Sequence, residues 1–217
     1  MKVAIVANSC WNLFNYRREL IQAIHSEFGE VVLIAPEDRY ASMLPKGKGI
    51  HYIPVLHLDK TSSNLIKELR FVIELFRIYY REKPDLIMHY TIKPNVFGSM
   101  IAHVLGIPSI ATVTGLGSSF TKHNKLSLLI CWLYRLAFRY NKINIFQNHT
   151  DRNFFLQKKL VNEINSGVIL GSGVDCNYFV PRAKSESNKF IFLFIGRLIR
   201  SKGIVEYLKA ASLIKSK

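Results

Sequence analysis

Basic side chains follow a short apolar run near the C-terminal end of the sequence. The run Phe190–Ile195 is rich in aromatic and β-branched residues and stops at Gly196, after which Arg197 and Lys202 precede a helical pattern. We expect a buried parallel strand, a basic loop and a helix. The free amide groups and the dipole of a helix N-terminus add positive potential to such a loop. The segment therefore predicts a site for a phosphate or diphosphate, with an ordinary strand–helix turn as the alternative.

Further candidate side chains directly follow apolar runs earlier in the sequence. Ligands of open parallel sheets bind outside the carboxyl ends of the strands, so the residues after each run are candidates. They are Asn8, Asn12, Tyr16 and Arg17 after the first run, His89 and Lys93 after the fourth, and Thr114, Gly115 and Gly117 after the fifth. Lys93 would contact an anion, and the glycines would let a ligand approach the backbone. A solvated first-turn arginine is the alternative for Arg17, and we expect His89 to be structural.

These runs belong to a regular alternation of short apolar segments and longer helical segments. We expect strands at residues 2–7, 31–35, 50–55, 85–89, 109–114, 143–147 and 167–170. We expect helices at residues 16–25, between 62 and 83, and at 95–105, 125–140 and 151–160, the last one capped by Asp151. Repeated strand–helix–strand units build a parallel sheet with helices on both faces. The sequence therefore predicts an α/β fold with a doubly wound, parallel, Rossmann-like sheet.

The segment between residues 62 and 83 shows the clearest helical periodicity. Its apolar residues recur at steps of three and four, and its charged residues do the same out of phase. The predicted inward residues are Leu65, Leu69, Val72, Phe76 and Tyr79, and the predicted outward ones are Lys67, Arg70, Glu74, Arg77 and Arg81. The solvent face of this helix should therefore be basic.

Composition sets limits on the partners of the chain. Its 217 residues include 30 Lys and Arg against 15 Asp and Glu, a net charge of +15, so an anionic partner is expected. Charge alone leaves nucleic acid, anionic lipid and sugar phosphates open. Three widely spaced cysteines indicate neither a disulfide framework nor a zinc site. No D-x-D, H-x-x-x-H or C-x-x-C spacing occurs, so no metal is expected.

The helix expected at residues 125–140 combines apolar bulk with basic residues. Leu129, Trp132 and Leu133 lie within it, and Arg135 and Arg139 follow. Such a helix suits the surface of an anionic membrane, and a buried core helix is the alternative. No uncharged stretch reaches the length needed to span a bilayer.

Four segments resemble one family of enzymes. GRLIRSKGIVE is similar to the G-R-L-x-x-x-K-G-x-x-E loop of GT-B glycosyltransferases of family 4, and GSGVDCNYFVP resembles their G-x-G-V-D-x-x-x-F-x-P segment. NSCWNLFNYRREL and HYTIKPNVFG look like segments of the bacterial branch that acts on lipid-linked saccharides. The resemblance covers the whole chain as the N-terminal domain and the opening of the second domain of a GT-B fold.

The resemblance implies a role for each candidate residue. Arg197 and Lys202 would be the catalytic cations that hold the diphosphate of a nucleotide sugar, a UDP-sugar by the same resemblance, with Gly196, Gly173 and Asp175 also at the donor. The acceptor-binding residues would be Asn8, Asn12, Tyr16, Arg17, Lys93, Thr114, Gly115 and Gly117. No cofactor or metal is implied, because the nucleotide sugar is a co-substrate. The acceptor would be a lipid-linked glycan at the inner, cytoplasmic face of the cell membrane, contacted through the helix at 125–140.

The resemblance also implies a domain division. Residues 1–175 would form the acceptor-binding domain, 176–188 a linker, and 189–217 the first strand–helix unit of an incomplete nucleotide-sugar domain. Since the family's base pocket and donor-holding glutamates would lie further on, we expect the chain alone to be inactive. A non-catalytic, basic membrane- or acceptor-binding module is the alternative. Nucleic acid is not an expected partner, because no helix-turn-helix, RRM or zinc motif is present.

Overall fold

The computed structural model describes residues 1–59, 64–116, 125–181 and 190–215. The chain divides into two compact units, Met1–Val174 and Asp175–Lys217. The first unit contains the whole sheet. The second contains one described helix.

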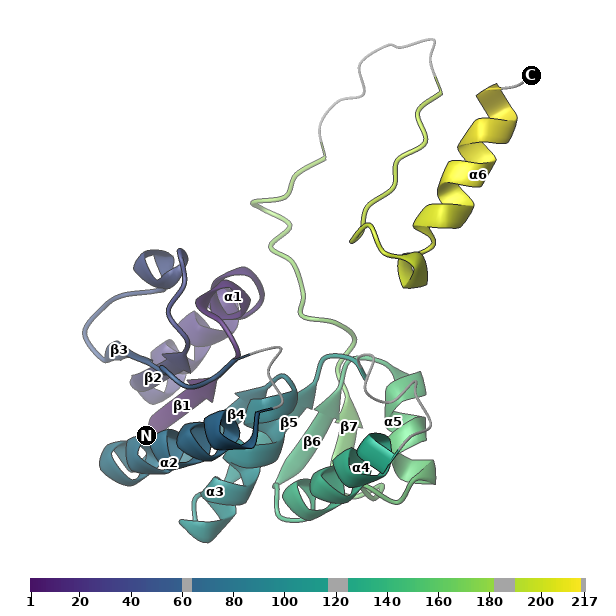
Figure 1. Cartoon of the computed structure of the whole chain (residues 1–217). Coiled ribbons are helices and arrows are strands. Elements are labelled where there is room, and N and C mark those ends of the chain that lie inside the picture. Colours follow the sequence, from purple (N-terminus) through teal and green to yellow (C-terminus); the bar gives the residue numbers. More distant parts are fainter. Residues whose placement is uncertain (60–63, 117–124, 182–189, 216–217) are drawn as a thin grey trace. The chain divides into compact units, whose positions relative to one another are not determined.

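The first unit is built on a sheet of seven parallel strands in the order β3-β2-β1-β4-β5-β6-β7 (Figure 1). The strands are β1 Lys2–Val6, β2 Glu30–Ala35, β3 Ile50–Pro54, β4 Leu86–Tyr90, β5 Ser109–Val113, β6 Ile143–Phe146 and β7 Ser166–Val168. The strand order reverses between β1 and β4, as it does in doubly wound folds. The predicted α/β, Rossmann-like architecture is therefore confirmed.

Helices cover both faces of this sheet. They are α1 Cys10–Phe28, α2 Leu65–Glu82, α3 Ser99–Val104, α4 Lys125–Phe138 and α5 His149–Gln157, with a π-helical turn at Pro94–Gly98 before α3. Successive residues of a strand point to opposite faces. Val3 and Ile5 accordingly pack with α1, whereas Ala4 and Val6 pack with α2 and α3. The helices α4 and α5 pack over β5 and β6 in a third cluster, and Ala111 of β5 joins it.

Helix α1 begins six residues earlier than expected. The polar segment predicted as a turn starts the helix at Cys10 because the side chain of Ser9 caps it, accepting a hydrogen bond from the backbone N–H of Asn12 at 3.2 Å. The early start places Arg17 in the third turn of the helix, on its buried side. A similar correction applies to α5, where Asn148 caps the helix and accepts from the backbone N–H of Asp151, so the prediction of Asp151 as the cap was wrong.

The inward face of α2 agrees with the predicted one at Tyr79, which is fully buried, and at Val72, which packs against the core, but not elsewhere. Leu65 and Leu69 are 83% and 60% exposed, whereas Phe71 and Leu75 are fully buried. The helix carries apolar side chains on most of its circumference, so periodicity alone could not select the side that packs on the sheet. Its outward face is both basic and apolar, because the exposed residues include Arg70, Arg77, Arg81, Ile73 and Tyr80.

His89 at the end of β4 is a structural group, as expected. It is fully buried, its Nε2 lies 2.9 Å from the hydroxyl of Tyr79, and its Nδ1 lies 3.4 Å from the hydroxyl of Ser99. Burial lowers the pKa of this imidazole to about 3, so the ring is neutral. Gly98 leaves the space that the ring occupies, since a Cβ there would lie 2.5 Å from two ring atoms.

In the second unit, the predicted strand at Phe190–Ile195 is absent and the segment is irregular. A strand needs a partner edge, and the described part of this unit contains no other strand. Its apolar side chains are accordingly exposed, with Phe190 at 86% and Ile195 at 86%. The helix α6 follows at Ile204–Lys215 after a 3₁₀ turn at Arg200–Lys202.

Candidate functional site

The carboxyl ends of β1, β4 and β5 meet at one edge of the sheet. Val6 pairs with His89, and Tyr90 pairs with Thr112, so the segments that follow these strands start side by side. The strand order reverses between β1 and β4. Such a reversal opens a crevice in which ligands of doubly wound folds bind.

A cavity of about 410 Å³ lies beside α1 at this edge. Its walls come from α1, from the α1-facing side of β4, β5 and β6, and from residues 169–173. The polar or aromatic residues among those that line it are Tyr16, Arg17, Glu19, Tyr90, Thr112, Gln147 and Ser172. The remaining lining includes aliphatic side chains such as Leu20, Met88 and Ile145. The cavity therefore offers a largely apolar surface with a few polar groups, which is typical of small-molecule sites.

Arg17 is the central charge of this cavity. Arg17 is only 5% exposed, and its guanidinium carbon lies 4.1 Å from the centre of the Tyr90 ring. Nη1 donates to the carbonyl of Tyr16 at 3.1 Å and to Ser172 Oγ at 3.0 Å, while the buried Nε has no acceptor. Burial lowers the pKa of this guanidinium, and Tyr90 and Tyr16 partly offset that effect. An arginine nevertheless stays charged at neutral pH.

Within the described residues, no ion pair joins Arg17 to an acid, although Glu19 also lines the cavity. A buried cation without a counter-charge is costly, and an anionic ligand would offset that cost. The structure thus does not support the alternative of a solvated arginine, because the side chain is almost fully covered. Arg17 is therefore a candidate contact for an anion.

Two polar residues beside Arg17 were not singled out from the sequence. Ser172 lies between Gly171 and Gly173, whose φ angles of 73° and 76° turn the chain so that its hydroxyl reaches Arg17. Gln147, directly after β6, donates from Nε2 to the same hydroxyl at 2.9 Å. The position of Gln147 after a strand and the paired glycines around Ser172 were the available signals.

The other predicted residues of the first unit lie around this edge with different environments. Lys93 forms an ion pair with Glu68 and donates to the backbone carbonyl of Asp59 at 2.6 Å, so the Glu68 carboxylate already offsets its charge. Tyr16 is half exposed and its ring meets Trp11 edge-on at 5.2 Å. Asn8 and Asn12 flank the cap of α1, and Thr114 and Gly115 follow β5. Gly117 lies outside the described residues.

The predicted donor residues belong mostly to the second unit. Arg197 and Lys202 are exposed there, and the 3₁₀ turn at Arg200–Lys202 ends at Gly203, which has a φ of 81°. Asp175 accepts backbone hydrogen bonds from Asn177 at 2.8 Å and Tyr178 at 3.3 Å, so its carboxylate caps a local turn. Across the described ranges, no three side chains of metal-binding type gather in one place.

A family model described as glycosyl transferase 4-like matches residues 2–149 of the chain. One curated relative is the N,N'-diacetylbacillosaminyl-diphospho-undecaprenol alpha-1,3-N-acetylgalactosaminyltransferase of Campylobacter jejuni, 26% identical over 234 aligned residues that cover 100% of this chain and 61% of the relative. Another is the UDP-Gal:alpha-D-GlcNAc-diphosphoundecaprenol alpha-1,3-galactosyltransferase of Escherichia coli, 26% identical over 162 residues, covering 70% of this chain and 42% of the relative. The chain therefore spans less than two thirds of the length of either relative.

Solved structures share the fold. HepE of Anabaena, in complex with UDP and glucose, matches with a TM-score of 0.58 and 17% identity over 82% of this chain and 46% of that one. A UDP-GlcNAc 2-epimerase from Methanocaldococcus jannaschii matches with a TM-score of 0.53 and 17% identity over 77% of this chain and 45% of that one.

Proposed function

This chain belongs to the glycosyl transferase 4-like family, and from that premise we propose that it serves the transfer of a sugar from a nucleotide sugar to a lipid-linked saccharide in glycan biosynthesis. The donor class we propose is a UDP-sugar. Both curated relatives carry a diphospho-undecaprenol acceptor in their names, and HepE was solved with UDP and glucose. The proposed acceptor is accordingly a saccharide on a polyprenyl diphosphate.

The observation that carries this proposal is the buried guanidinium of Arg17 at the carboxyl edge of the sheet. Its unpaired charge and the free Nε suit a phosphate oxygen of the acceptor. The apolar walls of the cavity suit the carbon-rich neighbours of such a group. The first unit would thus hold the acceptor, with Arg17 on its diphosphate.

We assign the donor to the basic turn of the second unit. During transfer, the oxygen of an acceptor hydroxyl forms a bond to the anomeric carbon of the donor and releases its proton to water, while the bond from that carbon to the nucleoside diphosphate breaks. The leaving diphosphate gains negative charge, which Arg197 and Lys202 would stabilise more in the transition state than in the ground state. No metal is needed for that role. Gly196, Gly173 and Asp175 remain proposed donor residues.

We also propose that the chain by itself binds acceptor without completing transfer. The described part of the second unit contains one helix and no strand, so it lacks a parallel sheet at whose edge a nucleotide would bind. A basic acceptor- or membrane-binding module is the second candidate function, and the same observation favours it. Titration of the chain with a UDP-sugar separates the two, because a donor site at Arg197 and Lys202 predicts binding and a non-catalytic module predicts none.

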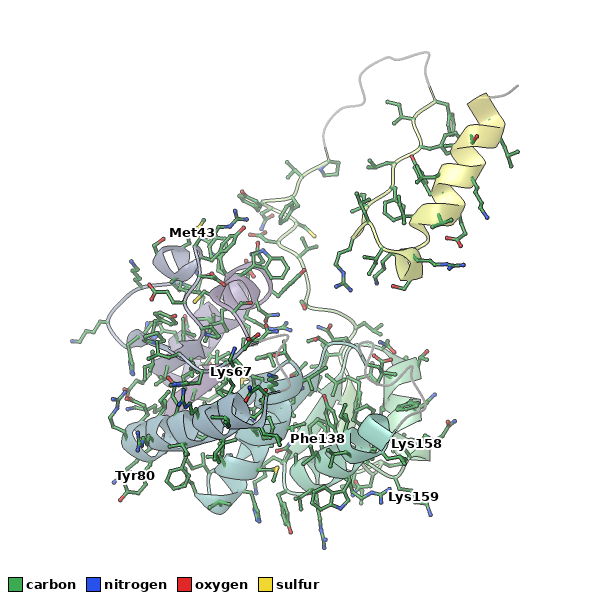
Figure 2. All side chains as sticks on the ribbon, in the orientation of Figure 1. Met43, Lys67, Tyr80, Phe138, Lys158 and Lys159 are labelled. Carbon is green, nitrogen blue, oxygen red and sulfur yellow. The ribbon has the colours of Figure 1, made fainter. Side chains whose placement is uncertain are left out.

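Contact with the inner face of the cell membrane is part of this proposal. Helix α4 exposes Leu128, Leu129 and Trp132, at 72%, 52% and 59%. On the same side of the sheet α2 exposes an apolar row with neighbouring arginines, and the Tyr80 side chain projects outward (Figure 2). Apolar side chains with adjacent basic ones suit an anionic lipid surface. In the described ranges, no helix combines the length and the apolar character that crossing a bilayer requires.

The test of the proposed function is acceptor binding. Binding of pyrophosphate and of a short-chain polyprenyl diphosphate sugar is measured by titration calorimetry for the wild-type chain and for Arg17→Gln. Loss of a charged hydrogen bond should weaken both about tenfold or more. Arg18→Gln is the matched control, because Arg18 is the exposed neighbour on the same helix and should leave both affinities unchanged. Equal affinities for wild type and Arg17→Gln would refute the assignment.

A further inference from the structure

The described residues contain five buried side-chain polar atoms without a hydrogen-bond partner, and all of them lie at one edge of the sheet. They are Asn12 Oδ1, Arg17 Nε, Glu68 Oε2, Thr91 Oγ1 and Asn95 Oδ1. Two belong to α1 after β1, one to the first turn of α2 after β3, and two to the segment after β4. Unsatisfied buried groups are rare in proteins, and each calls for a physical reason. All five share the edge at which ligands of doubly wound folds bind.

Most of these five atoms are hydrogen-bond acceptors. Four are oxygens that can accept a hydrogen bond, and one is the cationic N–H of Arg17. A complementary ligand therefore needs several hydrogen-bond donors next to an anionic group. Sugar hydroxyls next to a phosphate meet both requirements.

Backbone strain marks one of the oxygens. Thr91 directly follows β4 and has a φ of 73°, in the left-handed region that β-branched residues avoid. The other non-glycine residues with positive φ, Lys83 and Lys159, follow the C-terminal ends of α2 and α5, where this conformation is common. Thr91 does not follow a helix, so its positive φ has no such explanation. Strain of this kind tends to be kept at functional sites.

The second oxygen is fixed in place by the fold. Asn95 is 1% exposed, and its Nδ2 donates to the carbonyl of Thr112 at 2.9 Å. Because a carbonyl only accepts, this bond determines which end of the amide is the oxygen, and Oδ1 is left free. The backbone N–H of Asn95 donates to the carbonyl of Thr91 at 2.9 Å. The two residues therefore lie one helical turn apart, at the start of a π-helical turn, a feature frequent at functional sites.

Thr91 and Asn95 are not among the residues that line the cavity, but two lining residues, Tyr90 and Thr112, connect them to the anion site. Tyr90 precedes Thr91 in the chain and lies under the guanidinium of Arg17. Thr112 pairs with Tyr90 in the sheet register and accepts the hydrogen bond of Asn95. Thr91 and Asn95 therefore lie one contact away from residues that line the cavity of Arg17.

We propose that Thr91 Oγ1 and Asn95 Oδ1 form a hydroxyl-reading pair that accepts hydrogen bonds from the sugar attached to the phosphate held by Arg17. The proposal rests on the function proposed above and adds to it a sugar-recognising site in the first unit. The strained backbone of Thr91 and the hydrogen bond from Asn95 Nδ2 to the Thr112 carbonyl leave the two oxygens without a protein partner in the absence of the sugar. They would give the chain a preference for a sugar phosphate over a bare phosphate.

The experiment compares two soluble probes on the full 217-residue chain. Dissociation constants for N-acetylglucosamine 1-phosphate and for inorganic phosphate are measured by calorimetry under the same salt conditions. The sugar phosphate should bind about fivefold more tightly than phosphate. In Thr91→Val, which keeps the shape and removes the hydroxyl, this preference should disappear while the affinity for phosphate stays the same.

Two further variants separate recognition from folding. Thr91→Gly should remove the preference and also raise the melting temperature, because glycine adopts the left-handed conformation without strain. Lys159, which follows α5, also has a positive φ but lies far from Thr91 and Asn95 in the sequence (Figure 2). Lys159→Gly therefore relieves the same kind of backbone strain at a distant position. It should raise the melting temperature and leave the preference intact.

The outcomes distinguish the two levels of the proposal. If phosphate binds but the sugar phosphate binds no more tightly, or if Thr91→Val keeps the preference, the hydroxyl-reading pair is refuted and the anion site stands. Ordered water would then satisfy the two oxygens. If neither probe binds the wild-type chain, the anion site at Arg17 fails, and the pair fails with it.

Discussion

The guanidinium of Arg17 lies 4.1 Å from the centre of the Tyr90 ring, and no carboxylate pairs with it in the described part of the chain. The aromatic face offers a weak attraction to the cation in place of an ion pair. The charge therefore remains available to a ligand. An acid in the same position would have fixed the arginine and closed the site to anions.

The Tyr90 ring should contribute to anion affinity by holding the guanidinium in place. We expect Tyr90→Leu to weaken pyrophosphate binding about threefold or more, because the cation loses its aromatic support. Tyr90→Phe keeps the ring and is the matched control, with an expected affinity close to wild type. Calorimetric titration of both variants checks this, and equal affinities for the Leu and Phe variants would contradict it.

Gly98 should be intolerant of any side chain. A Cβ there would lie 2.5 Å from two atoms of the buried His89 ring and 2.9 Å from the hydroxyl of Tyr79. We expect Gly98→Ala to lower the free energy of unfolding by about 1–3 kcal/mol, the usual cost of overpacking. Urea unfolding measures this value. Gly47→Ala, where no atom lies within 4 Å of the new Cβ, should be close to neutral.

The buried His89 should make stability depend on pH. Burial lowers its pKa from 6.5 to about 3 in the folded chain, so between these values the unfolded chain binds a proton that the folded chain does not. Its contribution is present in full above pH 6.5 and is lost as the pH falls toward 3. The slope should be at most about 1.4 kcal/mol per pH unit.

Urea unfolding at a series of pH values checks this slope. His89→Gln should be less stable at neutral pH and should show a flatter dependence between pH 6 and about 4 than wild type. His149→Gln, at an exposed position, should keep the wild-type slope. A wild-type slope retained by His89→Gln would show that another group is responsible.

Exposed apolar residues of α4 should support membrane binding. We expect the double variant Leu129→Ser and Trp132→Ser to bind vesicles of phosphatidylcholine and phosphatidylglycerol several-fold more weakly than wild type in a sedimentation assay. Added salt should weaken the wild-type interaction, because the basic residues contribute through screened attraction. Met43→Ser is the control, because it removes a similarly exposed apolar side chain that belongs to neither α2 nor α4. If vesicle binding is unchanged in the double variant and at high salt, the exposed face of α4 is not the membrane-binding surface.

The alternation of apolar runs and helical segments was enough to predict the doubly wound sheet, because each parallel strand must be buried on both faces and each crossover requires a helix. Short motifs were enough to indicate the family. The position of Arg17 in the expected first turn of the helix after the first strand marked it as a candidate, since the carboxyl ends of parallel strands form the ligand edge. The strand–helix alternation, the family motifs and the position of Arg17 depend on residues that are close together in the chain, so they can be read from the sequence.

Other features depend on residues far apart in the chain. Whether Phe190–Ile195 forms a strand depends on a partner edge, and whether Leu65 or Phe71 of α2 faces inward depends on the sheet beneath the helix. That Ser172 reaches Arg17 across 155 positions, and that Thr91 and Asn95 retain unpaired oxygens, follows from how distant segments pack. Local pattern determined the elements and the family, whereas tertiary packing decided which polar atoms are satisfied within the protein and which remain open to a ligand.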